Sequence, residues 1–386
     1  MRVLYCAIDQ RVPGTLGGSV HTRSVADGLA ALGHEVHVLA APGDGPFPDG
    51  PAQWVAVAPP LGRAQLRGWR TNQVGALARR LRPDVVIERY HNFGGEGVFA
   101  ARAVGVPAVL EVNAPIVDHP GSAKARVDGM LLVRPMARRR AAICAHTDLF
   151  VTPSAAILPP EVPPDRVLEI EWGADTDRFR PGAPGAVPFP RPAPVVAVFA
   201  GAFRRWHGAI HLVHAIAALR ARGLEDLGAV FVGTGPEWSA VRDAASGLRG
   251  VVFTGVLPHG TMPAALAAAD IGVAPFDPSR HGPLSLGFYW SPLKVFEYMA
   301  SGLPVVAPRI PRLATLVEHG REGLLYDGAD PGALAATLET LAADRAGRVA
   351  LGAAARARAE REFSWRAHCV ALDEALRRLV DNGRPA

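Results

Sequence analysis

The sequence predicts an α/β fold made of two doubly wound parallel sheets, one in each half of the chain. Short apolar runs alternate with helical patterns, and strands that are apolar along their whole length are typical of parallel sheets covered on both faces. A Pro- and Gly-rich stretch, residues 180–194 (RPGAPGAVPFPRPAP), interrupts this alternation, which then restarts. The length of 386 residues exceeds what one hydrophobic core usually holds.

In the first half, the apolar runs predict strands at residues 3–8, 35–39, 54–57, 85–88, 108–111, 149–152 and 167–170. The helical patterns predict helices at residues 19–32, 70–81, 96–103, 123–145 and 154–158. We place the first Rossmann-like domain at residues 1–180, with residues 180–194 as the linker.

In the second half, strands are expected at residues 195–200, 229–233, 251–254, 271–275 and 305–307, and helices at residues 207–222, 237–246, 262–269 and 331–343. We place this second Rossmann-like domain at residues 195–363. A final long amphipathic helix starts at about residue 364, and we expect residues 364–386 to cross back onto the first domain. Two such domains joined by a hinge are expected to face a central cleft, with ligands at the carboxyl ends of the strands.

The composition is that of a soluble globular protein, with 49% hydrophobic and 20% charged residues and no apolar run long enough to span a bilayer. The first residues read as a buried strand rather than a signal peptide. The three scattered cysteines lack metal-ligand spacing and indicate reduced thiols, so we expect a cytoplasmic protein. The net charge of +5 comes with arginines spread along the chain, which does not indicate a nucleic-acid partner.

One basic cluster stands out within the predicted helix at residues 123–145. It interleaves apolar residues with Lys124, Arg126, Arg134, Arg138, Arg139 and Arg140. A basic amphipathic helix can rest on an anionic membrane or guide an anionic substrate. The alternative, which we favour, is a surface helix with a solvated face.

The most informative stretch is residues 291–306, SPLKVFEYMASGLPVV, which reads as a helix, a tight turn and a buried strand. Pro292 suits a first helical turn, and Leu293 and Lys294 follow where free backbone N–H groups favour an anion. Glu297 lies three residues past Lys294, so both can point to one side of the helix. A cation for phosphate and a carboxylate for sugar hydroxyls suit a nucleotide-sugar site. The alternative is an ordinary amphipathic helix with a surface Lys–Glu pair.

Glycine-rich turns follow several of the predicted strands. Gly17 and Gly18 precede the first helix, where they could approach an anion or simply form a loop before Ser19 as helix N-cap. The second domain opens with Gly201, followed by Arg204, Arg205, Trp206 and His207, which suits a diphosphate; surface arginines on a loop are the alternative. The turns at Gly233 and at Gly255–Val256 could hold a base through backbone hydrogen bonds.

Taken together and in order, these motifs resemble the retaining GT-B glycosyltransferases of family 4. The resemblance rests on Gly17-Gly18, the strand–Gly201–Arg204 turn, Gly233-Thr-Gly235-Pro236, Phe253-x-Gly255, Ala268-Ala-Asp270, Glu297-Tyr-Met-Ala-Ser-Gly302-Leu-Pro and Glu322-Gly323-Leu-Leu. It implies a UDP-sugar donor bound mainly by the second domain, with Glu297 on the ribose and Lys294 and Arg204 on the diphosphate. The Gly17-Gly18 loop would close over the donor phosphate.

The sequence departs from the family pattern at several positions. The family often has two glutamates separated by seven residues, and Tyr289 stands at the first of them. The usual arginine and lysine of the second-domain turn fall at Ala202 and His207. A histidine that commonly follows the fifth strand is Asn113 here, and its role toward the reacting sugar could pass to Asn113, His91 or His119. This variant set is similar to natural-product transferases, some of which glycosylate aminocyclitols.

Polar residues at the end of strand four and after strands four and five are candidates for the acceptor side. They are His91, Glu88, Asp118 and His119, and carboxylates there would suit an acceptor that carries amines; surface or structural roles are the alternative. Asp175-Thr-Asp177 could bind a divalent ion, but its context favours a turn-capping role. We therefore expect no metal and no cofactor other than the donor substrate.

These observations predict a metal-independent enzyme that moves a hexose, GlcNAc or glucose, from a UDP-sugar to a small polar acceptor with retention of configuration. The acceptor could be an aminocyclitol in antibiotic biosynthesis. Arg204, Lys294 and Asn113 are the expected catalytic residues. Three alternatives stay open: a membrane-associated glycolipid or polysaccharide transferase, a UDP-sugar 2-epimerase, and a non-catalytic nucleotide-sugar-binding protein.

Overall fold

The computed structural model describes residues 1–14, 16–119, 122–131, 133–328, 330 and 332–383. The chain divides into two compact units, which are described separately. Unit 1 comprises Met1–Trp172, Tyr289–Ser291 and Trp365–Ala386, and unit 2 comprises Gly173–Phe288 and Pro292–Ser364. Among the described residues, no helix has both the length and the apolar character needed to cross a bilayer.

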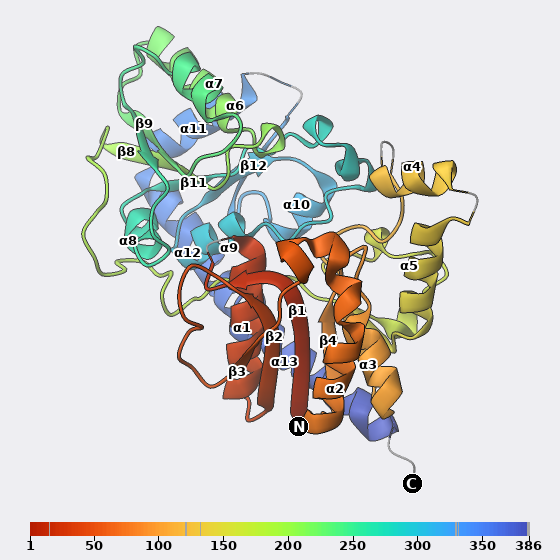
Figure 1. The fold of residues 1–386 in the computed structure, drawn as a ribbon. Helices are drawn as coiled ribbons and strands as arrows, with labels where there is room; N and C mark the ends of the chain where they lie inside the picture. The colour runs from red at the N-terminus through yellow and green to blue at the C-terminus, as the bar shows by residue number, and fades with distance from the viewer. Residues whose placement is uncertain (15, 120–121, 132, 329, 331, 384–386) are drawn as a thin grey trace. The chain divides into compact units, whose positions relative to one another are not determined.

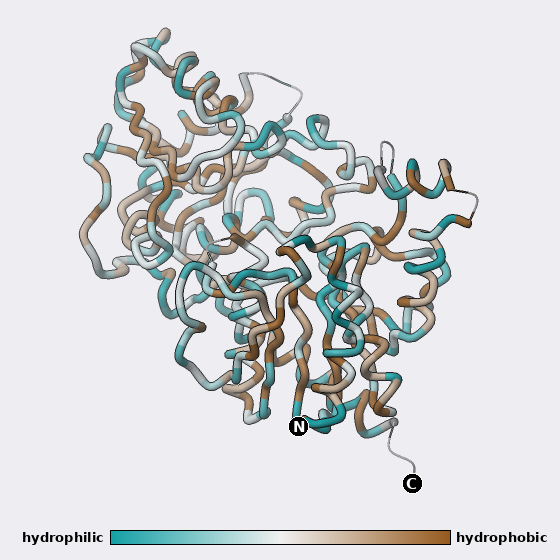
Figure 2. The backbone as a smooth tube through the Cα atoms, in the orientation of Figure 1, coloured by the Kyte–Doolittle hydropathy of each residue, from teal (hydrophilic) through white to brown (hydrophobic). Residues whose placement is uncertain are grey.

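Unit 1 contains a parallel sheet of seven strands in the order β3-β2-β1-β4-β5-β6-β7, of which β1 to β4 are labelled in Figure 1. The strands are β1 (Arg2–Val12), β2 (Glu35–Pro42), β3 (Gln53–Ala56), β4 (Val85–Arg89), β5 (Ala108–Glu111), β6 (Leu149–Thr152) and β7 (Val167–Glu169). The five central strands carry almost uninterrupted buried residues, because helices cover both faces of the sheet. The hydrophobic colouring along these strands is visible in Figure 2. This is the doubly wound arrangement expected from the sequence.

The helices of unit 1 pack in two groups. Helix α1 (Gly17–Ala31) packs against the C-terminal helix α13 (Trp365–Gly383), and α2 (Thr71–Leu81) packs against α3 (Glu96–Val104) (Figure 1). The α1–α13 contact is close, since a Cβ on Gly28 would overlap the thiol of Cys369. His34 Nε2 also lies 2.7 Å from Asp373 Oδ1. The remaining short elements are the 3₁₀ turns η1 (Pro60–Gly62), η2 (Ala64–Arg70), η3 (Ala155–Ile157) and η4 (Pro164–Arg166).

The single helix predicted at residues 123–145 is wrong, because the structure has two helices there. These are α4 (Ala123–Met130) and α5 (Pro135–Ala145). Arg134 has a left-handed backbone (φ 45°) and Pro135 occupies the first helical turn, which suits a helix start. Asp128 of α4 accepts hydrogen bonds from the N–H groups of Met136 and Ala137, at 2.8 and 2.7 Å, and so caps the new helix.

Unit 2 contains a six-stranded parallel sheet in the order β10-β9-β8-β11-β12-β13. The strands are β8 (Val195–Ala200), β9 (Leu227–Val232), β10 (Val251–Gly255), β11 (Ile271–Val273), β12 (Val305–Pro308) and β13 (Gly323–Tyr326). The helices are α6 (Ala209–Ala221), α7 (Trp238–Ala244), α8 (Met262–Ala267), α9 (Leu293–Ala300), α10 (Pro311–Leu316), α11 (Ala333–Ala343) and α12 (Arg345–Glu362), with 3₁₀ turns η5 (Arg205–His207), η6 (Pro278–Arg280) and η7 (Gly282–Leu286). The sequence reading did not anticipate β13, α10 or α12.

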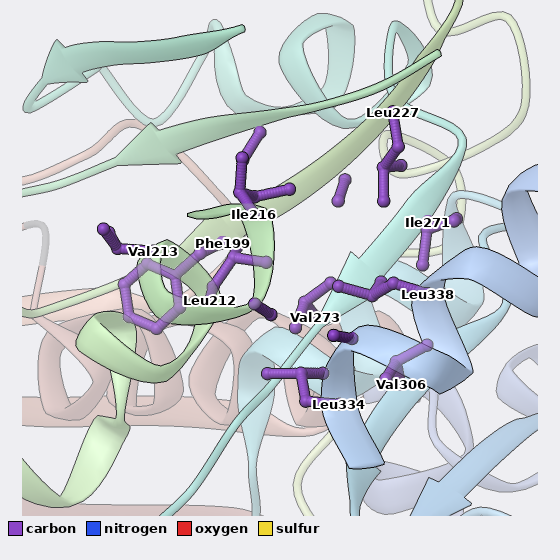
Figure 3. Close-up of a cluster of buried hydrophobic side chains, with 14 of the residues drawn as sticks. Phe199, Leu212, Val213, Ile216, Leu227, Ile271, Val273, Val306, Leu334 and Leu338 are labelled. Carbon is purple, nitrogen blue, oxygen red and sulfur yellow. The ribbon is translucent and has the colours of Figure 1, made fainter. Parts of the chain in front are cut away.

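The core of unit 2 lies between its sheet and helices α6 and α11. Phe199, Ile271 and Val273 from the strands meet Leu212 and Ile216 of α6, and all five are fully buried (Figure 3). On another part of the sheet, α9 packs against α12. This packing fixes the carboxyl ends of β8 and β11, where the site described below is built.

The structural division falls after Trp172, upstream of the Pro- and Gly-rich stretch. Residues between Gly173 and Val195 form no regular element, but Phe179 and Phe189 are buried within unit 2. Arg356 of α12 donates hydrogen bonds to the carbonyls of Thr176 and Phe179, at 2.9 and 2.6 Å. Residues 176–179, together with Phe189, are therefore packed onto unit 2.

Candidate functional site

The strand order of unit 2 changes direction between β8 and β11, and doubly wound sheets bind ligands outside the carboxyl ends of their strands at such a switch point. Lys294 of α9 brings its ammonium to this point. Its Nζ lies 4.2 Å from the ring centre of Phe199 on β8 and 5.2 Å from that of Phe276, which follows β11. The aromatic faces attract the cation, but they offer no oxygen or nitrogen lone pair to replace the hydrogen bonds that an ammonium makes to water.

The ammonium of Lys294 is buried without a hydrogen-bond partner. Lys294 is 8% exposed, and its Nζ bonds to no other group among the described residues. Burial lowers the pKa of Lys294 to about 7, although the nearby carboxylate of Glu297 acts in the opposite direction. An unpaired buried cation is costly, so the position favours a bound anion.

Gly201 leaves the space that Lys294 occupies. Its φ is +140°, which favours glycine, and a Cβ would lie 3.0 Å from Lys294 Nζ. The N–H of Gly201 donates to Val232 O at 2.9 Å, and the N–H of Gly233 donates to Gly255 O at 2.8 Å. A Cβ on Gly233 would overlap the carbonyl of Gly201. The three strand-end turns therefore pack backbone to backbone, so Gly233 has a structural reason to be glycine.

Glu297 lies one turn beyond Lys294 on α9 and is half-buried. Burial raises the pKa of Glu297 to about 7, while Lys294 acts to lower it. Lys294 and Glu297 each affect the pKa of the other, which agrees with the expectation that both side chains lie on one side of the helix. Leu293, the first residue of α9, is half-buried, whereas Val256 is 63% exposed and follows the edge strand β10, two strands away from β8.

The turn after Gly201 carries a free arginine and a neutral histidine. Arg204 is exposed, and its guanidinium forms no hydrogen bond or ion pair with the residues in the described ranges. His207 Nδ1 lies 2.5 Å from Ala202 O, and since a carbonyl only accepts, Nδ1 carries the proton. Burial, then the charge of Lys294, lowers the pKa of His207 to about 2. The family pattern has a lysine at this position, which would be charged, whereas His207 is uncharged when the site is empty.

In unit 1, Gly17 and Gly18 form the first turn of α1. The helix begins at Gly17 with Leu16 as N-cap, so the interpretation of Ser19 as N-cap is wrong. Gly18 packs closely, because a Cβ there would overlap the side-chain oxygen of Gln10 and lie 3.5 Å from Arg89 Nη2. The turn thus lies beside an arginine at the carboxyl end of β4.

Asn113 follows β5 and is held at both ends of its amide. Nδ2 donates to Glu111 Oε1 at 2.6 Å, and Oδ1 accepts from Trp172 Nε1 at 2.8 Å. The sequence reading did not link Asn113 to Trp172. The tryptophan was visible in the Glu171-Trp-Gly turn, but a pairing across 59 residues depends on tertiary structure.

Glu88 is buried and engaged inside unit 1. Its carboxylate accepts hydrogen bonds from the N–H groups of Gly97 and Val98, at 2.8 and 2.9 Å, and so caps α3. Arg67, which is fully buried, ion-pairs with Glu88, Asp9 and Glu96. The predicted acceptor role of Glu88 thus has a structural alternative, and Arg67 gave no sequence signal because it lies in a 3₁₀ segment without periodicity.

The other predicted acceptor residues lie after β4 and β5. His91 Nδ1 accepts from the N–H of Phe93 at 3.3 Å, and burial lowers the pKa of His91. Asp118 accepts from Arg140 Nη2 at 2.8 Å and from Ser122 Oγ at 3.2 Å. The carbonyl of His119 accepts from the N–H of Ser122 at 2.9 Å.

No group of three or more His, Cys, Asp or Glu side chains that could hold a metal ion occurs in the part of the chain that the structure describes. Asp175, from the Asp-x-Asp pair, accepts a hydrogen bond from the N–H of Arg178 at 3.2 Å. Its turn-capping role is thereby confirmed.

Two segments of the chain match known families. Residues 194–344 match the family described as Glycosyl transferases group 1, and residues 16–159 match Glycosyltransferase Family 4. A D-inositol 3-phosphate glycosyltransferase of Corynebacterium efficiens is 32% identical over 58% of this chain and 54% of its own length. The enzyme of that name from Pseudarthrobacter chlorophenolicus is 29% identical over 95% of this chain and 91% of its own length. The chain spans about half the length of the first of these relatives.

The structural comparison agrees with the sequence matches. The structure of Anabaena Alr3699/HepE in complex with UDP superposes with a TM-score of 0.69 at 18% identity and covers 98% of this chain and 100% of that chain. At this identity the similarity bears on the fold. The chain therefore has the GT-B fold, with two Rossmann-like parallel-sheet units, each of which contains a segment that matches a glycosyltransferase family.

Proposed function

We propose that the protein is a glycosyltransferase that moves a hexose from a nucleotide sugar, a UDP-sugar, to a hydroxyl of a small polar acceptor. The observation that carries this proposal is the Lys294 ammonium at the switch point of unit 2, which has no hydrogen-bond partner among the described residues. A diphosphate supplies the anion that this buried cation lacks.

The proposed donor contacts follow from the site. Lys294 and Arg204 contact the diphosphate, and Glu297 accepts hydrogen bonds from the ribose hydroxyls. The choice of UDP is supported by the fold shared with a protein that was solved with UDP. GlcNAc and glucose are the proposed sugars, and an aminocyclitol or another small polyol is the proposed acceptor, in keeping with the inositol phosphate acceptor named for the relatives.

We further propose retention of configuration by front-face displacement, without a metal. The leaving diphosphate takes the acceptor proton, and Lys294 and Arg204 stabilise the charge that develops on it, which is the largest contribution expected in such a reaction. Asn113 contacts the transferred sugar. Being an amide, it can act neither as nucleophile nor as base.

The donor affinity should depend on pH through Lys294. Anion binding needs the protonated ammonium, whose pKa is about 7 in the empty site, so UDP affinity should fall by up to about tenfold per unit as the pH rises from 7 to 9. Over this range the phosphates of UDP are already ionised. Isothermal titration of UDP at each pH measures the effect. Lys294→Arg, whose guanidinium stays charged, should not lose affinity over this range, although Glu297, whose pKa is also about 7, ionises within it. An equal fall in affinity in both proteins would contradict the assignment.

The activity itself is tested by mass-spectrometric detection of UDP release from a panel of UDP-sugars, with GDP-mannose as a comparison, in the presence of EDTA. Acceptors should include 2-deoxystreptamine and D-inositol 3-phosphate. Release of UDP together with a glycosylated acceptor supports the proposal and names both substrates. Donor binding without acceptor-dependent cleavage would favour an epimerase or a binding protein.

A second candidate function, transfer to a lipid-linked acceptor, is favoured by one surface feature. The α4–α5 corner exposes Val127, Met130, Leu131 and Val133 together with Arg126, Arg134 and Arg138. An exposed apolar patch beside exposed arginines suits an anionic membrane surface. In contrast, three other basic side chains form hydrogen bonds within unit 1, namely Lys124, Arg139 and Arg140. Fewer basic groups are therefore available for a membrane surface than the sequence suggested. Co-sedimentation with phosphatidylglycerol vesicles separates the two candidates.

A further inference from the structure

We propose that Glu111 and Trp172 are positioning residues that hold the Asn113 amide in one orientation, with a single N–H left for the substrate. This inference rests on the proposed function, because it concerns how Asn113 contacts the transferred sugar. Its consequence is a restriction on that contact. Asn113 can donate one hydrogen bond to a sugar oxygen through its second Nδ2 hydrogen, while one of the two lone pairs of its carbonyl is already taken by Trp172 Nε1.

The chemistry of the two neighbours fixes the orientation of the amide. An indole N–H can only donate a hydrogen bond, and an ionised carboxylate can only accept one. The group 2.8 Å from Trp172 Nε1 must therefore be the amide oxygen, and the group 2.6 Å from Glu111 Oε1 must be the amide nitrogen. In a flipped amide, the NH2 group would face the indole N–H of Trp172 and the carbonyl would face the carboxylate of Glu111, and neither pair could form a hydrogen bond. The orientation of the amide therefore follows from its two neighbours and does not depend on telling oxygen from nitrogen by position.

Glu111 is held in place by several contacts, so its carboxylate can orient the Asn113 amide. It is 4% exposed, and its carboxylate also accepts from Arg89 Nη1 at 3.0 Å and from the hydroxyl of Tyr5 at 2.5 Å. Burial by itself would raise the pKa of Glu111, but the neighbouring His21 and Arg89 lower it below its usual range. The carboxylate therefore stays ionised and keeps its role as an acceptor.

Trp172 is likewise fixed on both its backbone and its ring. Its N–H donates to Ser291 Oγ at 2.9 Å, and Ser291 Oγ donates to Glu171 Oε2 at 2.5 Å. The indole lies 4.5 Å from the ring of His21 and 5.6 Å from the guanidinium carbon of Arg89. The indole N–H therefore has little freedom to leave Asn113.

One hydrogen on Asn113 Nδ2 has no partner among the residues in the described ranges, and Asn113 is half-buried rather than enclosed. This N–H is the one hydrogen-bond donor of the amide that a ligand can use without breaking an internal bond. A sugar hydroxyl would meet it with its oxygen lone pair. A substrate that lacks an oxygen at this place would leave the donor unpaired, which costs affinity in the transition state.

The test is a double-mutant cycle with Trp172→Phe and Asn113→Ala, in which Trp365→Phe serves as the matched control. Trp365 belongs to the same aromatic cluster, 6.4 Å from Trp172, but is not bonded to Asn113. We expect Trp172→Phe to lower kcat about tenfold and to change the donor KM by less than about twofold. Asn113→Ala should lower kcat about a hundredfold, and the kcat of the double variant should be no lower than that of Asn113→Ala alone. Trp365→Phe should stay within about twofold of the native protein.

The inference would be overturned if Trp172→Phe and Trp365→Phe lowered kcat equally. It would also be overturned if the loss of kcat in the double variant equalled the product of the losses in the two single variants. A second measurement does not need activity. The indole ¹⁵N–¹H signal that disappears in Trp172→Phe should shift in Asn113→Ala, whereas the signal that disappears in Trp365→Phe should not. An unshifted Trp172 signal would also overturn the inference. If no donor is cleaved by the native protein while the signal shifts as expected, the proposed function fails and the positioning by Trp172 stands.

Discussion

Replacing Lys294 with methionine is expected to lower kcat/KM by about a thousandfold or more and to abolish measurable binding of UDP. The change removes the buried ammonium that lies over Phe199 and Phe276, while a methionine of similar length retains the apolar contacts. The loss is large because a leaving diphosphate develops charge in a water-poor site, where a fixed cation is worth several kcal/mol.

The same replacement should leave the fold intact or make it more stable. Lys294 is 8% exposed and its ammonium has no partner among the described residues, so its removal relieves a desolvation cost of about 1–3 kcal/mol. Urea denaturation and UDP titration of one preparation test both statements. Lys124→Met is the matched control, since Lys124 bonds to the backbone carbonyls of Pro115 and Ile116 instead. If the turnover of Lys294→Met stayed within threefold of that of the native protein, Lys294 would not be part of the donor site.

Replacing Arg67 with leucine is expected to give the largest loss of stability, about 3–5 kcal/mol in the free energy of unfolding of unit 1. Arg67 is fully buried and ion-pairs with Asp9, Glu88 and Glu96. Without it, three carboxyl groups from β1, β4 and α3 remain close together with no cation between them. The proposed donor site in unit 2 contains none of these residues.

The loss in Arg67→Leu should grow as the pH rises. Burial and the charge of Glu96 already raise the pKa of Glu88, and Arg67 counteracts this. A carboxyl group whose folded pKa lies above its unfolded value stabilises the fold at low pH and loses that contribution as the pH rises through the folded pKa. The gap in denaturation midpoint from the native protein should therefore be wider at pH 8 than at pH 5. Arg63→Leu, an exposed change in the segment just before η2, should stay within about 0.5 kcal/mol. A constant gap across this range would show that the lost packing of Arg67, rather than its charge, dominates.

The strands and most helices could be predicted from the sequence because parallel strands buried on both faces are continuous apolar runs. Strands β5, β6 and β8 begin and end where the pattern placed them. The single helix predicted at residues 123–145 failed because the apolar and basic pattern continues through the break. The break itself depends on Pro135, on the left-handed Arg134 and on a cap supplied by Asp128.

The candidate site divides in the same way. Lys294, Glu297 and Gly201 could be found because each follows a predicted strand or opens a predicted helix, and strand ends meet at one edge of a parallel sheet. The buried, unpartnered state of the Lys294 ammonium could not be found, because it depends on Phe199, Phe276 and Gly201 from separate segments. For the same reason, nothing near Glu88 in the chain indicated that α3 and Arg67 would engage its carboxylate.

The sequence by itself determined the two doubly wound sheets, the order of the motifs and the residue types at the strand ends, since all of these follow from local periodicity and turn chemistry. Only the tertiary structure decided which polar groups are free to act. It left the Lys294 ammonium without a hydrogen-bond partner in the part of the chain that the structure describes, and it bonded Glu88 to the N–H groups of α3. It also oriented the Asn113 amide between Glu111 and Trp172. The physical reason is that burial and hydrogen-bond partners come from residues far apart in the chain, and these set the charge and the available atoms of each functional group.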